Sequence, residues 1–377
     1  MEMTGPWWAA AAGLIVGAAA GFAVRRARLC TFGALEDALV GGDTRRLRVF
    51  GLALAIAVAG TQALVLGGLL RPESTTYVAA ALPWFGVLAG GLLFGLGMAL
   101  VGTCAFGSLV RLGGGDLRSL VVLLVFGAVA YATLRGVLAT TRLAVFESGP
   151  LVLPVTGGTD LPALLDPVLG IATRPWLAAA IAAVLAAAAL GDRRLRRARR
   201  LMVAGVVLGL AVTAGWIATT LLVDEFAEPM APQSLTFVAP VARALFGLLL
   251  DPAGLVEFGI ASVLGVVVGA ALAARGADEF RWEAFDDPRE MKRHLTGAVL
   301  MGAGGVVCGG CTIGQGLTAG SLMALSWPLA VVGMAIGARL GIAFLVEGSI
   351  LGMARGALLP ALDLWPSRLR SAGRDKP

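Results

Sequence analysis

Residues 90–113 read GGLLFGLGMALVGTCAFGSLVRLG, and residues 297–320 read GAVLMGAGGVVCGGCTIGQGLTAG. Placing Cys104 on Cys311 aligns the two stretches without a gap. The positions that then carry glycine in both are Gly90, Gly95, Gly97, Gly102, Gly107 and Gly113 in the first stretch, and Gly297, Gly302, Gly304, Gly309, Gly314 and Gly320 in the second. This agreement indicates an internal duplication. It predicts a fold built from two copies of one helical unit, each with a glycine-rich span followed by a cysteine motif.

The composition is that of a membrane protein. The 377 residues are 58% hydrophobic and 14% charged, with a mean hydropathy of +0.86. A soluble protein this apolar would lack the polar side chains to cover its surface. Apolar runs of about 20 residues, each able to cross ~30 Å of hydrocarbon, predict an all-α polytopic membrane protein with about nine transmembrane helices. We expect the spans at residues 7–24, 49–70, 84–103, 119–138, 175–191, 201–222, 256–274, 295–310 and 326–347.

Arginine clusters alternate from loop to loop and predict the topology. Arg25, Arg26 and Arg28 follow the first span, and the run 193–200 follows the fifth, whereas the intervening loops hold isolated arginines. The positive-inside rule then places the N-terminus outside and the C-terminus in the cytoplasm. The two copies would cross the membrane in opposite directions, and such inverted repeats are common in transporters.

This topology predicts one integral membrane domain, residues 1–377. We expect an N-terminal repeat over residues 1–140 and a C-terminal repeat over residues 256–377, with connecting spans and outer loops over residues 141–255. Transporters of this architecture hold their substrate near the midplane, where broken helices meet. Short re-entrant helices are therefore expected beside the spans.

Three of the four cysteines share one frame, in the strings Cys30-Thr31-Phe32-Gly33, Cys104-Ala105-Phe106-Gly107 and Cys311-Thr312-Ile313-Gly314. Glycine permits a helix to break just before each cysteine, and the next half-helix would then direct its N-terminal amides at a common site. That geometry suits an anion. For the first copy we expect a short helix or re-entrant segment at about residues 30–41.

The candidate site residues follow from this frame. Cys30, Cys104 and Cys311 are expected to line a substrate path. Thr103, Thr312 and Gln315 are possible accessory donors to substrate oxygens, although each could instead cap a helix end. Cys308 forms a Cys-x-x-Cys with Cys311 and is a further accessory candidate. Arg135 and Arg339 would either attract anions to a pore mouth or extend to the membrane interface.

Other functional classes find no support in the sequence. The net charge of +6 is spread over topology-setting loops, so we expect no nucleic-acid partner. The single histidine, His294, is expected in a basic loop, and no second Cys-x-x-Cys occurs, so no metal site is predicted. No Gly-x-x-x-x-Gly-Lys-Ser/Thr string for ATP is present. We predict no cofactor and no catalytic residues.

The strings Gly102-Thr103-Cys104-Ala105-Phe106-Gly107 and Gly310-Cys311-Thr312-Ile313-Gly314-Gln315-Gly316-Leu317 resemble the YeeE/YedE family of bacterial inner-membrane proteins. The resemblance covers most of the chain. It implies uptake of thiosulfate, or a similar small sulfur-containing anion, across the inner membrane. It also implies an hourglass-like helical fold narrowed by re-entrant helices, three cysteines on the path, and a small cytoplasmic sulfur-carrier protein as partner.

The chain departs from the family pattern at two positions. Gln315 stands where histidine is frequent, and Cys308 adds a cysteine. Alternatives therefore stay open: selenium-related transport, or a membrane thiol redox or sulfur-transfer protein that uses Cys308 and Cys311. Thiols with an ordinary pKa of about 8.5 are mostly neutral at pH 7. We expect them to donate hydrogen bonds to the anion, whereas a covalent persulfide relay would need a thiolate.

Overall fold

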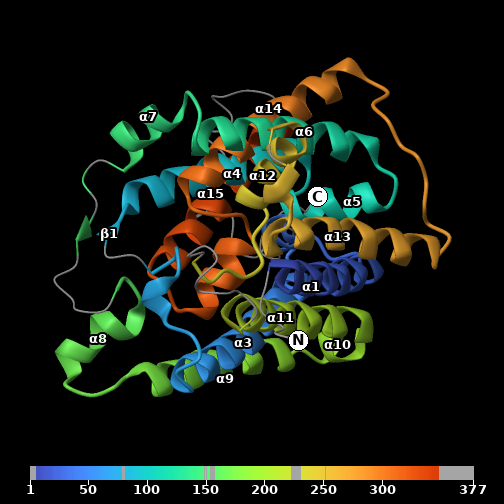
Figure 1. Ribbon diagram of the computed structural model, residues 1–377. Coiled ribbons are helices and arrows are strands. Elements are labelled where there is room, and N and C mark those ends of the chain that lie inside the picture. Colours follow the sequence, from blue (N-terminus) through green and yellow to red (C-terminus); the bar gives the residue numbers. More distant parts are fainter. Residues whose placement is uncertain are drawn as a thin grey trace, which may run out of the picture.

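The computed structural model describes residues 6–78, 81–147, 149, 151–152, 158–221, 231–250 and 252–347. Within these residues the regular structure is helical apart from one antiparallel pair of two-residue strands, β1 (Ala81–Leu82) and β2 (Leu151–Val152). The helices pack side by side in one bundle (Figure 1). The protein is an all-α polytopic membrane protein, as the composition predicts.

A helix coincides with each of the nine predicted spans. These helices are α1 (Pro6–Ala27), α3 (Arg45–Leu66), α4 (Trp84–Val101), α6 (Leu117–Leu134), α9 (Arg174–Leu190), α11 (Arg199–Leu221), α13 (Phe258–Arg275), α14 (Pro288–Val307) and α15 (Ser326–Glu347). Seven helical stretches in the described residues have the length and apolar composition of a membrane span. The 17-residue α9 is shorter, and α14 begins with a charged turn.

Further short elements occupy the connections. They are α2 (Thr31–Leu39), η1 (Pro72–Ser74), α5 (Ala105–Gly113), α7 (Ala139–Thr141), η2 (Arg142–Phe146), α8 (Leu161–Leu169), α10 (Arg193–Arg197), α12 (Ala239–Leu250), η3 (Pro252–Leu255) and η4 (Gly314–Ala319). The α2 helix occupies most of the segment predicted at 30–41. The apolar helix α12 lies in a region that the sequence assigned to an outer loop, because its 12 residues are too few to cross a bilayer.

Glycines let several helices pack backbone against backbone. A Cβ on Gly91 of α4 would lie 2.8 Å from the Ala330 carbonyl oxygen of α15, so no larger side chain fits there. The α1–α13 pair is similar, because Gly13, Gly17 and Gly21 face successive carbonyls of α13. Small residues spaced four apart are typical of close helix pairs in membranes. In each pair, the contacts move toward the C-terminal end of both helices together, so the two helices are parallel. The predicted topology requires this, because α1 and α13, and likewise α4 and α15, are an even number of spans apart.

The crossing of α4 and α14 is antiparallel, and its contacts are reciprocal. A Cβ on Gly90 would meet the Gly304 carbonyl oxygen at 2.8 Å, and one on Gly304 would meet the Gly90 oxygen at 2.7 Å. Gly97 and Gly297 approach in the same way, at 2.6 and 2.8 Å. Under the sequence alignment Gly90 corresponds to Gly297 and Gly97 to Gly304. Replacing each glycine by its counterpart in the other copy therefore turns the Gly90–Gly304 contact into the Gly297–Gly97 contact. A two-fold axis between inverted copies would produce this relation.

Both helices at this crossing end in the same way. Gly102 after α4 has φ +77°, and Gly309 after α14 has φ +76°, in the left-handed region that glycine adopts without strain. Each break falls just before a cysteine of the repeated frame. The expected helix breaks are therefore present, and the short elements α5 and η4 follow them. The boundaries of the predicted repeats, at residues 140 and 255, remain predictions.

The arginine-rich connections gather at one end of the bundle. The segment between α1 and α2 lies beside Arg200 of α11 and residues 273–279 at the end of α13. Figure 1 shows α10 and the α13–α14 connection at this end, with α7, α8 and β1 at the opposite end. The basic residues of the C-terminus, Arg368 to Lys376, lie outside the described residues.

The structure corrects the placement of His294. The sequence placed this residue in a basic loop, but α14 begins at Pro288, where Asp287 accepts a hydrogen bond from the Arg289 amide and caps the helix. His294 is consequently helical and buried, 3.8 Å from Glu290. Among the described residues no group of histidine, cysteine and carboxylate side chains is arranged to hold a metal ion.

The glycine crossing gives a stability prediction. We expect Gly97→Ala to lower the thermal midpoint of the purified protein, because the new methyl group would collide with the α14 backbone; overpacking of this kind costs about 1–3 kcal/mol. The matched control is Gly51→Ala in α3, where the new Cβ meets nothing within 4 Å. That substitution should leave the midpoint unchanged or raise it. Equal melting of the two variants would contradict close backbone contact at the crossing.

Candidate functional site

Two of the predicted path cysteines accept an amide hydrogen bond at the turn that begins the next element, and Cys104 is the N-cap residue of α5. The Cys104 sulfur accepts a hydrogen bond from the Gly107 amide at 3.4 Å, and the Cys311 sulfur accepts one from the Gly314 amide at 3.4 Å. A cap of this kind satisfies an amide that a helix start leaves unpaired. The repeated Cys-x-x-Gly spacing is therefore a capping pattern. Cys30 begins α2 in the same position but makes no such hydrogen bond.

Threonine hydroxyl groups connect the three cysteine segments. The Cys30 sulfur lies 3.5 Å from the Thr103 hydroxyl. The Thr31 hydroxyl is 3.8 Å from the Cys104 sulfur and 3.4 Å from the Thr312 hydroxyl. Three segments, joined by contacts across 73 and 281 positions of the chain, thus meet at one place. We call the group formed by Cys30, Thr31, Thr103, Cys104, Cys311 and Thr312 the cysteine–threonine cluster.

The cluster is enclosed on one side and open on the other. Cys104 and Cys311 are fully buried, and Thr103 is 1% exposed. Cys30 and Thr31 are only half-buried. Since α2 follows Arg25, Arg26 and Arg28 in the chain, the half-buried members lie on the side of the cluster nearest the arginine-rich end of the bundle.

The glycines of the frame leave room for hydroxyl groups. A Cβ on Gly107 would overlap the Thr103 hydroxyl, and one on Gly314 would lie 2.5 Å from the Thr236 hydroxyl and 3.1 Å from the Tyr77 hydroxyl. Tyr77 belongs to the connection after α3, which approaches from the end opposite to α2. Hydroxyl groups therefore border the Cys311 segment on the side facing away from Cys30.

Cys308 and Gln315 serve the backbone of the Cys311 turn. The Cys308 thiol is 3.0 Å from the Gly310 carbonyl oxygen, to which it donates. The Gln315 amide nitrogen donates to the Cys308 carbonyl at 2.7 Å, and the Ser326 hydroxyl donates to the Gln315 side-chain oxygen at 3.3 Å. Gln315 is thus fully engaged and 2% exposed. Gln315 therefore stabilises the turn between Cys308 and Cys311. The Cys308 thiol is directed at backbone carbonyls of the same turn.

The segment after Cys311 is fixed by polar contacts from separate elements. Gln62 of α3 donates to the Ser321 carbonyl at 2.8 Å, and the Trp216 indole of α11 donates to the Ser321 hydroxyl at 3.2 Å. Thr318 donates to the Leu235 carbonyl at 2.7 Å. An irregular segment at membrane depth must satisfy its polar groups within the protein. The Gln62 contact does so for the Ser321 carbonyl, the Trp216 contact for the Ser321 hydroxyl, and the Thr318 contact for the Leu235 carbonyl of the neighbouring connection.

The three arginines near the broken helices have different surroundings. Arg111 of α5 donates to the Gly102 carbonyl at 3.0 Å and so holds the break before Cys104. Arg135 is exposed at the end of α6, and Arg339 is half-buried in α15. Within the part of the chain that the structure describes, no hydrogen bond or ion pair links Arg135 or Arg339 to the cysteine–threonine cluster.

The sequence of this chain matches a known protein family over most of its length. The model of a family described as sulphur transport matches residues 26–340, which include all three cysteine segments. The chain belongs to this family. The YeeE/YedE membership expected from the glycine–cysteine strings is thereby confirmed, and the protein is a transporter and not an enzyme.

Two curated relatives in the family carry the same name. The chain is 31% identical over 343 residues to the thiosulfate transporter TsuA of Escherichia coli (strain K12), an alignment that covers 86% of this chain and 91% of the relative. It is 31% identical over 339 residues to the thiosulfate transporter TsuA of Spirochaeta thermophila, covering 86% of this chain and 96% of that relative. The match therefore spans nearly the whole length of each relative.

Sequence reasoning found the cysteines of the cluster but missed part of its polar shell. Thr31, Tyr77, Thr236 and Arg111 were not singled out. Thr31 had a detectable signal, since it follows Cys30 as Thr312 follows Cys311. Tyr77 and Thr236 lie in connections without a repeated pattern, so only the folded chain shows that they approach Gly314.

Burial predicts the order of thiol reactivity. We expect N-ethylmaleimide to modify Cys30 first in the folded, detergent-solubilised protein, because this thiol is half-buried and the other three are fully buried. Peptide mass spectrometry of samples taken over time gives the extent of modification at each cysteine. In dodecyl sulfate, as a control, all four should react alike. Modification of Cys311 or Cys308 before Cys30 in the folded protein would contradict the burial of these two thiols in the cysteine–threonine cluster and its turn.

Proposed function

We propose that this protein imports thiosulfate, or a similar small sulfur-containing anion, across the bacterial inner membrane through a midplane constriction lined by the cysteine–threonine cluster. The single observation that carries the proposal is the meeting of three Cys-Thr pairs at the breaks of three helices. The names of the two TsuA relatives support thiosulfate as the substrate.

The chemistry of the cluster suits such a substrate. Thiosulfate is a dianion with oxygens at one end and a polarizable sulfur at the other. An anion crossing hydrocarbon needs donors and positive dipole ends, because an unpaired charge there is costly. Threonine hydroxyls would serve the oxygens, and weakly donating thiols would serve the soft sulfur. Sulfate has no soft end, so thiol contacts would favour thiosulfate.

The same arrangement favours release as well as entry. A conduction pathway must bind its ion strongly enough to admit it and weakly enough to let it leave. Neutral hydroxyl and thiol donors are individually weak, and no Lys or Arg makes a hydrogen bond or ion pair with the cluster among the described residues. We infer that the thiols act as hydrogen-bond donors without a covalent intermediate.

We infer that the end of the bundle with the arginine-rich connections faces the cytoplasm. The N-terminus would then lie outside, and the C-terminus, which falls outside the described residues, would be cytoplasmic. A small cytoplasmic sulfur-carrier protein that accepts the imported sulfur at this end belongs to the same proposal. So do contacts of the exposed apolar helix faces with membrane lipid.

A direct test measures uptake of radiolabelled thiosulfate into cells that lack their own sulfate and thiosulfate importers. We expect uptake with the wild type and its loss with Cys311→Ala, Cys104→Ala or Cys30→Ala while the protein remains in the membrane. Cys308→Ala should retain uptake, because its thiol donates to a backbone carbonyl. Absence of uptake by the wild type would remove thiosulfate as substrate and bring selenium-related transport forward.

The same variants separate transport from sulfur transfer. A thiol redox or sulfur-transfer protein that uses Cys308 and Cys311 as a pair would lose activity equally with Cys308→Ala and Cys311→Ala. It would also accumulate a disulfide or persulfide at Cys311. Intact-thiol mass spectrometry after exposure to thiosulfate should instead find four free thiols.

The threonine hydroxyls give a sharper prediction. We expect Thr31→Val to reduce thiosulfate uptake several-fold, since valine keeps the shape but removes the hydroxyl that contacts Cys104 and Thr312; a lost hydrogen bond is worth about 1 kcal/mol. Thr31→Ser keeps the hydroxyl and should restore most of the uptake. If valine and serine behave alike, the hydroxyl contributes nothing to transport.

A further inference from the structure

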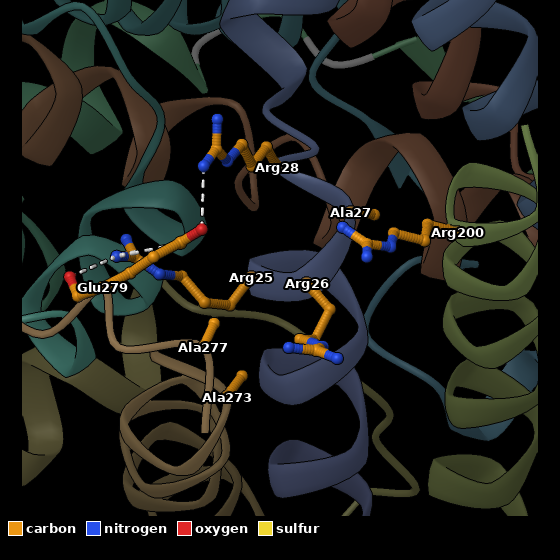
Figure 2. Close-up of a pocket in the computed structure, with 8 residues that line it drawn as sticks. All are labelled: Arg25, Arg26, Ala27, Arg28, Arg200, Ala273, Ala277 and Glu279. Atoms are coloured by element: carbon orange, nitrogen blue, oxygen red, sulfur yellow. Dashed lines mark hydrogen bonds and ion pairs between the residues drawn. The ribbon is translucent and has the colours of Figure 1, made fainter. Parts of the chain in front are cut away.

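A polar recess of about 320 Å³ opens at the arginine-rich end of the bundle. It is lined by Arg25, Arg26, Ala27, Arg28, Arg200, Ala273, Ala277 and Glu279. These residues come from the end of α1 and the residue after it, the start of α11, and the end of α13 with the connection that follows it (Figure 2). We call this the arginine recess. With four guanidinium groups and one carboxylate, its lining carries a net charge of +3.

The single carboxylate is already shared by two of the arginines. Glu279 accepts a hydrogen bond from Arg28 at 2.8 Å and lies 3.9 Å from Arg25. Figure 2 shows these two side chains converging on Glu279. The hydrogen bond from Arg28 and the charges of Arg28 and Arg25 lower the pKa of Glu279, so its carboxylate stays charged at neutral pH.

Two arginines of the recess form no ion pair among the described residues, although the charge of one of them, Arg26, also lowers the pKa of Glu279. Arg26 and Arg200 are exposed and make no hydrogen bond or ion pair with any residue that the structure describes. Figure 2 shows Arg200 extending from α11 toward Ala27 at the end of α1, and Arg26 lying along α1 and turned away from Glu279. Arg25 is held differently, because its guanidinium lies against Gly114 after α5.

The arginine recess is adjacent to the cysteine–threonine cluster in the chain. Arg28, with φ +49°, ends α1 in a left-handed turn, and Leu29 separates it from Cys30. Cys30 in turn contacts Thr103 of the cluster. The half-buried side of the cluster and the arginine recess are therefore built by consecutive residues of the same turn.

We propose that the arginine recess is a binding site for a tetrahedral oxyanion dianion, the stopping point of the transported anion on the α2 side of the cysteine–threonine cluster. The proposal rests on the transport function above and adds a second site to it. Arginine is suited to this ligand, because its planar donors pair with oxygens of phosphate-like anions and its charge is permanent. A recess of this volume is at the lower end of ligand sites in proteins.

The recess recognises a different part of the substrate from the cluster. Guanidinium groups pair with charged oxygens, so the recess should bind sulfate about as well as thiosulfate, whereas thiols favour a soft sulfur. Glu279 competes with the anion for Arg25 and Arg28. This internal carboxylate would hold the affinity low and so permit release, which a recess of unopposed arginines would not.

Residue-resolved footprinting tests the proposal independently of transport. Purified protein in phosphatidylcholine nanodiscs is treated with phenylglyoxal at increasing sodium thiosulfate or sodium sulfate, and modified arginines are quantified by mass spectrometry. We expect both anions to protect Arg26 and Arg200 but not Arg199, the adjacent exposed arginine on α11. Sodium chloride at equal ionic strength gives the background. Equal protection of Arg199, or none at Arg26 and Arg200, would overturn the proposal.

Charge variants give effects of opposite sign. The half-protecting concentration is the anion concentration that gives half-maximal protection from phenylglyoxal. Glu279→Gln removes the competing carboxylate and should lower this concentration about threefold, an effect of the size typical of an exposed charge pair. Arg26→Gln should raise the half-protecting concentration measured at Arg200, and Arg199→Gln should leave it unchanged. A half-protecting concentration that does not respond to Glu279→Gln would show that the recess charge does not govern binding.

A phosphate headgroup of an anionic lipid offers the same oxyanion chemistry. The footprint is therefore repeated in nanodiscs that contain phosphatidylglycerol. Protection by thiosulfate that persists there supports a dissolved anion. If Arg26 and Arg200 are already protected by phosphatidylglycerol and thiosulfate adds nothing, the occupant is lipid and the proposal is overturned.

Uptake assays separate this proposal from the proposed function. If the wild type transports no thiosulfate but sulfate and thiosulfate still protect the recess, the transport proposal fails and the oxyanion site stands without its role in release. If transport is normal in the wild type and its rate is unchanged by both Glu279→Gln and Arg26→Gln, the recess is not on the path. A reduced uptake rate in both variants supports a stopping point on the path.

Discussion

The close backbone contact between α4 and α14 is the constraint on which the rest of the structure depends. Gly90 with Gly304, and Gly97 with Gly297, leave no space for a side chain between the helices. In a membrane, where lipid is as apolar as leucine, such packing replaces the hydrophobic effect as the force between helices. The crossing also fixes where the two helices end relative to each other, and therefore where Cys104 and Cys311 begin the next elements.

From that crossing the polar chemistry of the cluster follows in steps. A helix that stops within the membrane leaves amide and carbonyl groups unpaired, and each would be costly in hydrocarbon. The left-handed glycines Gly102 and Gly309 turn the chain. The sulfurs of Cys104 and Cys311 accept amide hydrogen bonds at the next helix starts. The cysteines thus solve a structural problem created by the break. The Cys104 thiol also lies beside the Thr31 hydroxyl, and that hydroxyl contacts Thr312, the neighbour of Cys311.

The sequence predicted the parts of this protein that repeat, and the reason is physical. A glycine that must let backbones touch cannot be replaced without a collision, so the duplicated pattern preserves Gly90, Gly97, Gly297 and Gly304. The spans were predictable because bilayer thickness sets their length. The polar shell was less predictable, because Tyr77 and Gln62 reach the Cys311 segment from connections and helices that carry no repeated motif. His294 was misplaced since α14 extends beyond the hydrocarbon length through a capped, charged first turn.

The cluster and the arginine recess divide the recognition of one anion between weak and strong donors. Full positive charges beside the cluster would hold a dianion too tightly in a low-dielectric environment, where charge interactions are largest. The same charges at the exposed end are screened by water and salt, so they attract the anion without trapping it. Glu279 reduces that attraction further by occupying Arg28 and approaching Arg25. Neutral thiols and hydroxyls at the helix breaks, followed by partly neutralised arginines at the mouth, would therefore let a doubly charged ion both enter and leave.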